Sequence, residues 1–166
     1  EEVCHDKPLR FVRHMDGYEA DLVMMMDVLE HVDDDLALLQ TYVDAVPSGC
    51  HFLITVPAFS FMWSGHDEFL EHRRRYTLNE VEALLERAGL TLNKGAYYFG
   101  FVFPLALVSR MMGKLFEKPD EKPQSQLKHH YPIVNGLLKA ICKAELSMLS
   151  SNRLGGLSVF TLARKP

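Results

Sequence analysis

The chain has 166 residues, 48% of them hydrophobic, and a formal net charge of −4 from 18 basic and 22 acidic residues. This length and composition suit one globular domain with an ordinary core. The slight acidic excess, with no pool of basic residues beyond Arg73–Arg75, argues against a nucleic acid as partner.

The cysteines and the longest apolar stretch bear on where the protein works. Cys4, Cys50 and Cys142 are too few and too scattered for a disulfide framework or a zinc site, so we expect reduced thiols in a cytoplasmic protein. The stretch from Tyr97 to Val108 falls short of the ~20 residues of a membrane-spanning helix. We therefore expect no membrane span.

The first third of the chain predicts two strands and a helix. Leu9–Met15 (LRFVRHM) reads as a short strand, and Ala20–Met26 (ADLVMMM) is apolar on both faces, as is typical of a strand covered by helices on each side. Asp33–Asp35 suit the start of a helix, where acids are favourable. Apolar residues then recur at spacings of three and four, which predicts one buried helical face: Leu36, Leu39, Tyr42, Val43 and Val46.

The remainder alternates strands with helices. His51–Pro57 (HFLITVP) reads as a second buried strand that Pro57 closes. In TLNEVEALLERAGL, Thr77 and Glu80 form a capping box and Gly89 follows the predicted helix. LTLNKGAYYFGFVF contains another predicted strand, helices flank a polar linker between about 104 and 150, and GGLSVFTLARK predicts a last strand.

This order of elements indicates an α/β fold with a sheet that is at least partly parallel. In such sheets ligands lie beyond the carboxyl ends of the strands. The two apolar strands that end at Met26 and Pro57 both lead into polar, chemically active residues. We therefore expect the functional site at that edge of the sheet.

The first group of polar residues lies in DVLEHVDDD. If a helical turn begins near Asp27, then Asp27, Glu30 and His31 share one face, because they are three and four residues apart. Two carboxylates and an imidazole so placed can bind a divalent metal ion, or prepare His31 to act as a base. The alternative is structural, since acids at a helix start commonly cap it and a histidine there can simply hydrogen-bond a carbonyl group.

The second group lies in WSGHDEFLEHRRRYT. An aromatic anchor, two histidines and forked cations are typical of a lid or a substrate clamp. The candidates are Trp63, His66, His72, Arg74 and Tyr76. The alternative is a solvated charged loop that caps the next helix.

Four stretches in register resemble the C-terminal part of a class I S-adenosylmethionine-dependent methyltransferase. They are DLVMMMDVLEHVDDD, LLQTYVDAVPSGCHFLITVP, HDEFLEHRRRYTLNEVEALLERAGL and GGLSVFTLARKP. The resemblance implies a Rossmann-like methyltransferase sheet and methyl transfer from S-adenosylmethionine to a small-molecule acceptor. DVLEH is also similar to the acid-x-x-Glu-His of ubiquinone-pathway O-methyltransferases, in which a divalent metal ion is associated with those positions.

The resemblance also implies roles for single residues. By their position in the family, His14 and Met15 would lie near the adenine of the cofactor, and Asp27 and Val28 near its methyl-bearing sulfur. His31 is then the candidate base, with Asp27 beside it. The loop that carries Trp63, His66, His72, Arg74 and Tyr76 would face the acceptor.

One part of the family pattern is missing from these 166 residues. The strand with the glycine-rich cofactor loop should precede this sequence, which starts at Glu1 instead of Met. We expect a single incomplete methyltransferase-like domain, a fragment that is inactive alone, with a helical insertion at about 104–150. Ala20–Met26 would then form an unpaired apolar edge, unless Leu9–Met15 or a second subunit in a homo-oligomer covers it.

Two other functions remain as alternatives. One is a non-catalytic methyltransferase-like module that serves as an interaction surface. The other is an unrelated α/β domain such as a short-chain oxidoreductase, but no Tyr-x-x-x-Lys pair supports it.

Overall fold

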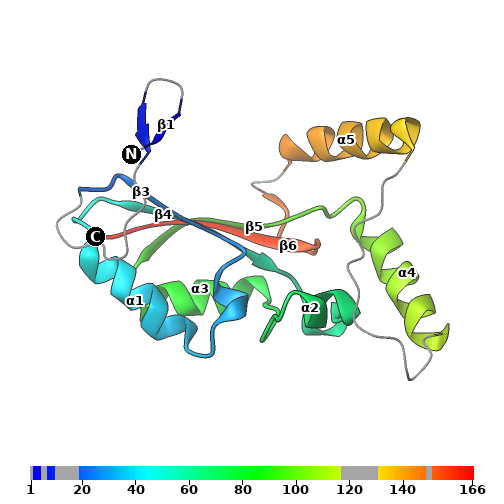
Figure 1. The fold of residues 1–166 in the computed structure, drawn as a ribbon, viewed down its shortest axis with the longest axis horizontal. Coiled ribbons are helices and arrows are strands. Elements are labelled where there is room, and N and C mark those ends of the chain that lie inside the picture. Colours follow the sequence, from blue (N-terminus) through cyan, green and yellow to red (C-terminus); the bar gives the residue numbers. More distant parts are fainter. Residues whose placement is uncertain (1, 5–6, 10–18, 117–130, 149–150) are drawn as a thin grey trace.

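The computed structural model describes the chain except for residues 1, 5–6, 10–18, 117–130 and 149–150. Its centre is a four-stranded mixed sheet in the order β3–β4–β6–β5 (Figure 1). β3 and β4 are parallel, and β6 runs antiparallel between β4 and β5. The strands are β3 (Leu22–Met26), β4 (His51–Pro57), β5 (Thr91–Tyr98) and β6 (Ser158–Arg164). The predicted α/β fold with a partly parallel sheet is thus confirmed.

Five α-helices and two short 3-10 turns connect the strands among the described residues. The turns are η1 (Leu29–His31) and η2 (Ser60–Met62). The helices are α1 (Asp35–Ala45), α2 (Gly65–Phe69), α3 (Leu78–Arg87), α4 (Phe103–Phe116) and α5 (Pro132–Leu146). Helices α4 and α5 lie where the sequence predicts helices on either side of a polar linker, and residues 117–130 of that linker lie outside the described residues. None of the described helices is both long and apolar enough to cross a bilayer.

A separate two-stranded hairpin precedes the sheet. It pairs β1 (Glu2–Cys4) antiparallel with β2 (Lys7–Leu9). The predicted strand Leu9–Met15 overlaps β2 at Leu9 only, and its other residues lie outside the described part of the chain. The pairing of Leu9–Met15 with β3 thus stays a prediction.

The capping predictions for two helices are confirmed. Oδ1 of Asp34 accepts a hydrogen bond from the backbone N–H of Ala37 at 2.9 Å, which caps α1. Thr77 and Glu80 form a capping box at the start of α3. The apolar face of α3 is buried: Leu78, Val81, Leu84 and Leu85.

The described helices α1 and α3 lie on the same face of the sheet (Figure 1). The topology explains this arrangement. The connection from β3 to β4 and the connection from β4 to β5 each join parallel strands, and both move across the sheet in the same direction. Right-handed crossovers in one direction place their helices on one face. The core forms there, around the fully buried Phe52, Ile54 and Val56 of β4.

One sequence prediction about β3 is wrong. Its apolar residues predict a strand covered on both faces, but only Val23 and Met25 are buried. Leu22, Met24 and Met26 are about half exposed, because the crossover helices cover the other face alone. Among the described residues, no strand pairs with the outer edge of β3.

Candidate functional site

Unusual backbone conformations mark the carboxyl ends of three strands. Asp27 follows β3 with φ 52°, Phe59 lies two residues after β4 with φ 60°, and Phe99 follows β5 with φ 62°. A residue other than glycine in such a region costs about 1–3 kcal/mol, and these residues cluster at functional sites. The strained edge is the one where the sequence predicts a site.

The turn after β3 carries a buried carboxyl group. The backbone N–H of Asp27 donates to the carbonyl oxygen of Thr55 at 3.0 Å, and the η1 turn follows. The Glu30 side chain in that turn is fully buried, and neither of its oxygens has a hydrogen-bond partner in the described structure. Burial, reinforced by the charge of Asp27, raises the pKa of Glu30 to about 7.

Two histidines complete a cluster with this carboxyl group. The rings of His31 and His72 meet edge to face with centroids 4.8 Å apart. One ligand atom from each of Glu30, His31 and His72 lies within 4.8 Å of the others. Nδ1 of His72 is 3.0 Å from Oδ1 of Asp67, so Nε2 is the nitrogen left to bind a metal or a proton.

Asp67 organises the far side of this cluster. Its carboxylate is fully buried and accepts hydrogen bonds from Nε of Arg75 at 2.7 Å and from the backbone N–H of Ser64 at 2.9 Å. Burial alone would raise the pKa of Asp67, but the hydrogen bond and charge of Arg75 and the hydrogen bond of His72 outweigh it and hold the pKa at about 2. Asp67 is therefore ionised and fixes the His72 ring.

Helix α4 closes the site from the other side. Arg110 of α4 donates to Oγ of Ser64 at 2.6 Å and to the carbonyl oxygen of Met62, and lies 3.4 Å from Asp67. The pocket formed here has a volume of about 300 Å³. Its lining is Asp27, Glu30, His31, Pro57, His66, Leu70, His72, Arg75, Ala106, Arg110, Leu157 and Ser158.

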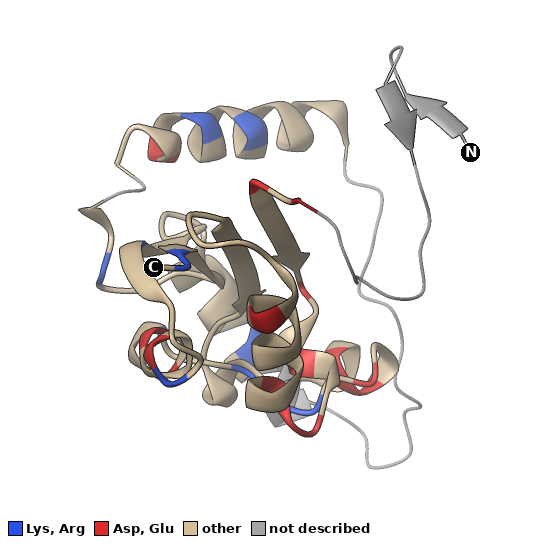
Figure 2. Cartoon of the chain, turned by 90° about the vertical axis from the view of Figure 1, so that its left-hand side faces the viewer, with Lys and Arg blue, Asp and Glu red and all other residues tan. Residues whose placement is uncertain are grey.

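The structure separates the predicted acceptor residues into two groups. His66 and His72 line the pocket, whereas Trp63, Arg74 and Tyr76 do not. Arg74 pairs with Asp35 at 3.3 Å, and the buried Tyr76 hydroxyl lies 2.9 Å from the same carboxylate. Figure 2 shows acidic and basic segments of the ribbon next to one another below the sheet. These two residues fasten the loop to the start of α1.

The predicted metal and cofactor residues are placed as follows. Glu30 and His31 belong to the cluster, but Asp27 lies outside it, because it precedes the η1 turn and its carboxylate accepts a hydrogen bond from Thr55 at 3.3 Å. Val28 is exposed beside it. His14 and Met15 lie outside the described residues.

Sequence reasoning left three site residues without a role: Asp67, Arg75 and Arg110. Asp67 and Arg75 stand within the predicted loop, and an acid between two histidines could have been read as their orienting partner. Arg110 has no signal in the sequence. It is 43 residues from Asp67, inside a segment that reads as an ordinary apolar helix.

The cluster has the donor set of a transition-metal site. Two imidazoles and one carboxylate suit Zn²⁺ and similar ions, and a second carboxylate that orients one histidine is the usual support of such a ligand. Without a metal, the same histidines can accept a proton from a bound hydroxyl or amine. Residues of α4 and of the charged loop form walls of the pocket around these side chains.

Comparisons with known proteins agree with this architecture. The profile of the family described as "Methyltransferase domain" matches residues 5–94, more than half of the chain. A comparison with curated proteins found no match. Among solved structures, a chain from the complex between the Haloferax volcanii Trm112 methyltransferase activator and a methyltransferase is similar, with TM-score 0.50 and 15% identity over 94% of this chain and 60% of that one.

A SAM-dependent methyltransferase from Archaeoglobus fulgidus is also similar, with TM-score 0.49 and 15% identity over 92% of this chain and 62% of that one. The present chain therefore spans about three fifths of the length of these two proteins. The profile match over residues 5–94 covers β3, the η1 turn, β4, the charged loop and α3. The chain belongs to the methyltransferase-domain family.

Proposed function

We propose that this protein transfers a methyl group from S-adenosylmethionine to a small-molecule acceptor. One observation carries the proposal: in a member of the methyltransferase-domain family, the titratable cluster around the buried Glu30 lies where the parallel strands β3 and β4 end. Ligands of open α/β sheets bind at such carboxyl ends. Asp27 and Val28, exposed at the end of β3, are the residues that would face the cofactor.

Methyl transfer requires the protein mainly to position the acceptor against the cofactor. When bound, S-adenosylmethionine supplies an electrophilic methyl group on a positively charged sulfur. This chain would hold the acceptor in line, exclude water and accept a proton from the attacking hydroxyl or amine. His31 is the candidate base, with its ring against that of His72.

We further propose, as the alternative use of the same residues, that Glu30, His31 and His72 bind a divalent metal ion, in which case the ion replaces His31 as the group that activates the acceptor. The fully buried, unpartnered Glu30 carboxyl group supports this, because such a group is costly unless a proton or a cation meets it. The imidazole-rich donor set favours Zn²⁺ over Mg²⁺ or Ca²⁺. A bound ion would lower the pKa of an acceptor hydroxyl.

Calorimetry with Zn²⁺ and the full protein tests the metal site. His72→Ala and Glu30→Ala should each weaken binding at least about tenfold, since each removes a ligand. Asp27→Asn is the matched control, because Asp27 lies beside the cluster and not within it. Equal loss in all three variants, or no loss in any, would remove the assignment.

Turnover tests the methyl transfer itself. The full protein, given S-adenosylmethionine and a panel of small hydroxyl and amine acceptors, should produce S-adenosylhomocysteine. His31→Ala should lower kcat by about 100-fold, the usual contribution of a positioned base. His51→Ala, at the opposite end of β4, should leave kcat unchanged. If no acceptor or cofactor is consumed and neither binds, the non-catalytic interaction module becomes the better account.

A further inference from the structure

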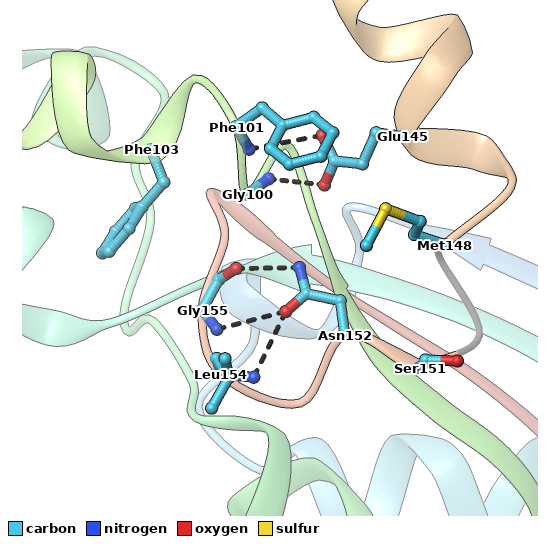
Figure 3. Close-up of a pocket in the computed structure, with 9 residues that line it drawn as sticks. All are labelled: Gly100, Phe101, Phe103, Glu145, Met148, Ser151, Asn152, Leu154 and Gly155. Carbon is cyan, nitrogen blue, oxygen red and sulfur yellow. Dashed lines mark hydrogen bonds between the residues drawn. The ribbon is translucent and has the colours of Figure 1, made fainter.

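A second cavity lies beside the titratable cluster and differs from it in character. It has a volume of about 470 Å³. Figure 3 shows its walls, which come from the turn after β5, the start of α4, the end of α5 and the segment that leads into β6. The lining is Gly100, Phe101, Phe103, Glu145, Met148, Ser151, Asn152, Leu154 and Gly155.

The main polar side chains in this lining are already engaged by the backbone. The buried Glu145 carboxylate accepts hydrogen bonds from the backbone N–H groups of Gly100 at 2.6 Å and Phe101 at 3.5 Å (Figure 3). The Asn152 amide donates to the carbonyl oxygen of Gly155 at 3.0 Å and accepts from the backbone N–H of Leu154 at 3.2 Å. These groups hold the wall together, so the surface left for a ligand is largely aromatic, aliphatic and thioether.

Two elements continue from this cavity into the titratable cluster. Phe103 lines the apolar cavity. Ala106 and Arg110, one and two turns later on α4, line the pocket that holds the titratable cluster. In the same way, Leu154 and Gly155 line the apolar cavity, while Leu157 and Ser158 line the pocket that holds the titratable cluster. A ligand in the apolar cavity would therefore contact the same two elements that line the pocket around the histidines.

We propose that this cavity binds an uncharged, apolar portion of the methyl acceptor, so that the acceptor is a molecule with a polar reacting group and a hydrophobic body. The inference rests on the proposed function for the assignment of the occupant as acceptor. A volume of about 470 Å³ lies within the range of small-molecule sites. The exposed Phe101 and Met148 at its mouth, each 55% exposed, give such a ligand an apolar entrance.

The fluorescent probe N-phenyl-1-naphthylamine tests the cavity without any methyl transfer. It is neutral and apolar, and its emission rises when it leaves water. The full protein should bind it saturably, and Met148→Glu should weaken binding about tenfold, because the new carboxylate must be desolvated beside the probe. Met112→Glu is the matched control, since Met112 is also 55% exposed but lies on α4 away from the lining.

Leu154→Glu provides a second variant at the opposite wall, where Leu154 is 97% exposed and its replacement leaves the core intact. It should weaken the probe as Met148→Glu does. Equal effects of Met112→Glu and Met148→Glu, or no saturable binding by the unsubstituted protein, would overturn the proposal. Probe binding in a protein that fails to bind S-adenosylmethionine would leave the apolar site standing and reject only its role in methyl transfer.

Discussion

The Nδ1 atom of His72 lies 3.0 Å from Oδ1 of Asp67, within one short loop that also supplies Arg75. This contact fixes both the orientation of the imidazole ring and the nitrogen that faces Glu30 and His31. A carboxylate behind a histidine is the usual support of a metal ligand or a base. The loop is therefore an organised part of the site, and Asp67 is its structural centre.

Replacing Asp67 should destabilise the protein strongly. Asp67→Asn removes the negative charge between two cations, Arg75 and Arg110, whose side chains are 6% and 20% exposed. We expect a loss of about 3–5 kcal/mol in the free energy of unfolding, because buried cations are left unpaired. Urea denaturation measures it.

The control is Asp33→Asn. Asp33 lies 3.6 Å from Arg73, and both side chains are mostly exposed, so the expected change is below about 0.5 kcal/mol. If both substitutions change the free energy of unfolding by a similar amount, Asp67 does not stabilise the loop through its contacts with Arg75 and Arg110.

The buried Glu30 carboxyl group should make stability fall with rising pH in metal-free protein. Its pKa rises from 4.5 to about 7 on folding, so the folded state holds the proton more tightly than the unfolded state. The contribution of Glu30 to the free energy of unfolding is complete below pH 4.5 and is lost as the pH rises through 7. It amounts to about 3 kcal/mol in total. Glu30→Gln should remove this decline.

Urea denaturation at pH 5 and pH 8, with a chelator present, measures the difference. The exposed Glu86 gives the control, because Glu86→Gln should follow the unsubstituted protein at both values. If Glu30→Gln shows the same decline as the unsubstituted protein, the carboxyl group is not buried as described.

Two glycines give a paired test of the fold around the apolar cavity. A Cβ at Gly156 would lie 2.2 Å from the carbonyl oxygen of Tyr98, whereas a Cβ at Gly136 on α5 would meet nothing within 4 Å. Gly156→Ala should lower the melting temperature by several degrees, because backbone atoms of the β5 end must move. Gly136→Ala should raise it slightly, since alanine favours a helix. The opposite order would contradict the placement of the segment before β6.

The parts of the fold that the sequence predicted are those in which local patterns and packing agree. His51–Pro57 is a strand with the predicted bounds, and Thr77 and Glu80 cap α3 as predicted, since capping and periodicity act within a few residues. The one-sided burial of β3 was not predictable in this way. It depends on which face each crossover helix covers, and the direction of both crossovers decides that.

Of the residues that the sequence suggested for a site, some line one pocket at this edge of the sheet and others do not. The spacing of Asp27, Glu30 and His31 suggested one helical face, yet the η1 turn begins after Asp27 and sets that residue apart. His72 enters from a loop about 40 residues later, so no spacing rule could pair it with Glu30. Contacts between segments distant in sequence follow from topology, and topology is weakly encoded in any single stretch.

Equilibrium binding of S-adenosylmethionine to the full protein, measured by calorimetry, tests the central claim most directly. We expect saturable binding that Val28→Glu abolishes, since Val28 is exposed at the end of β3, and that Val108→Glu on the outer surface of α4 leaves unchanged. No heat at millimolar ligand, or equal loss from both substitutions, would contradict a cofactor site at this edge of the sheet.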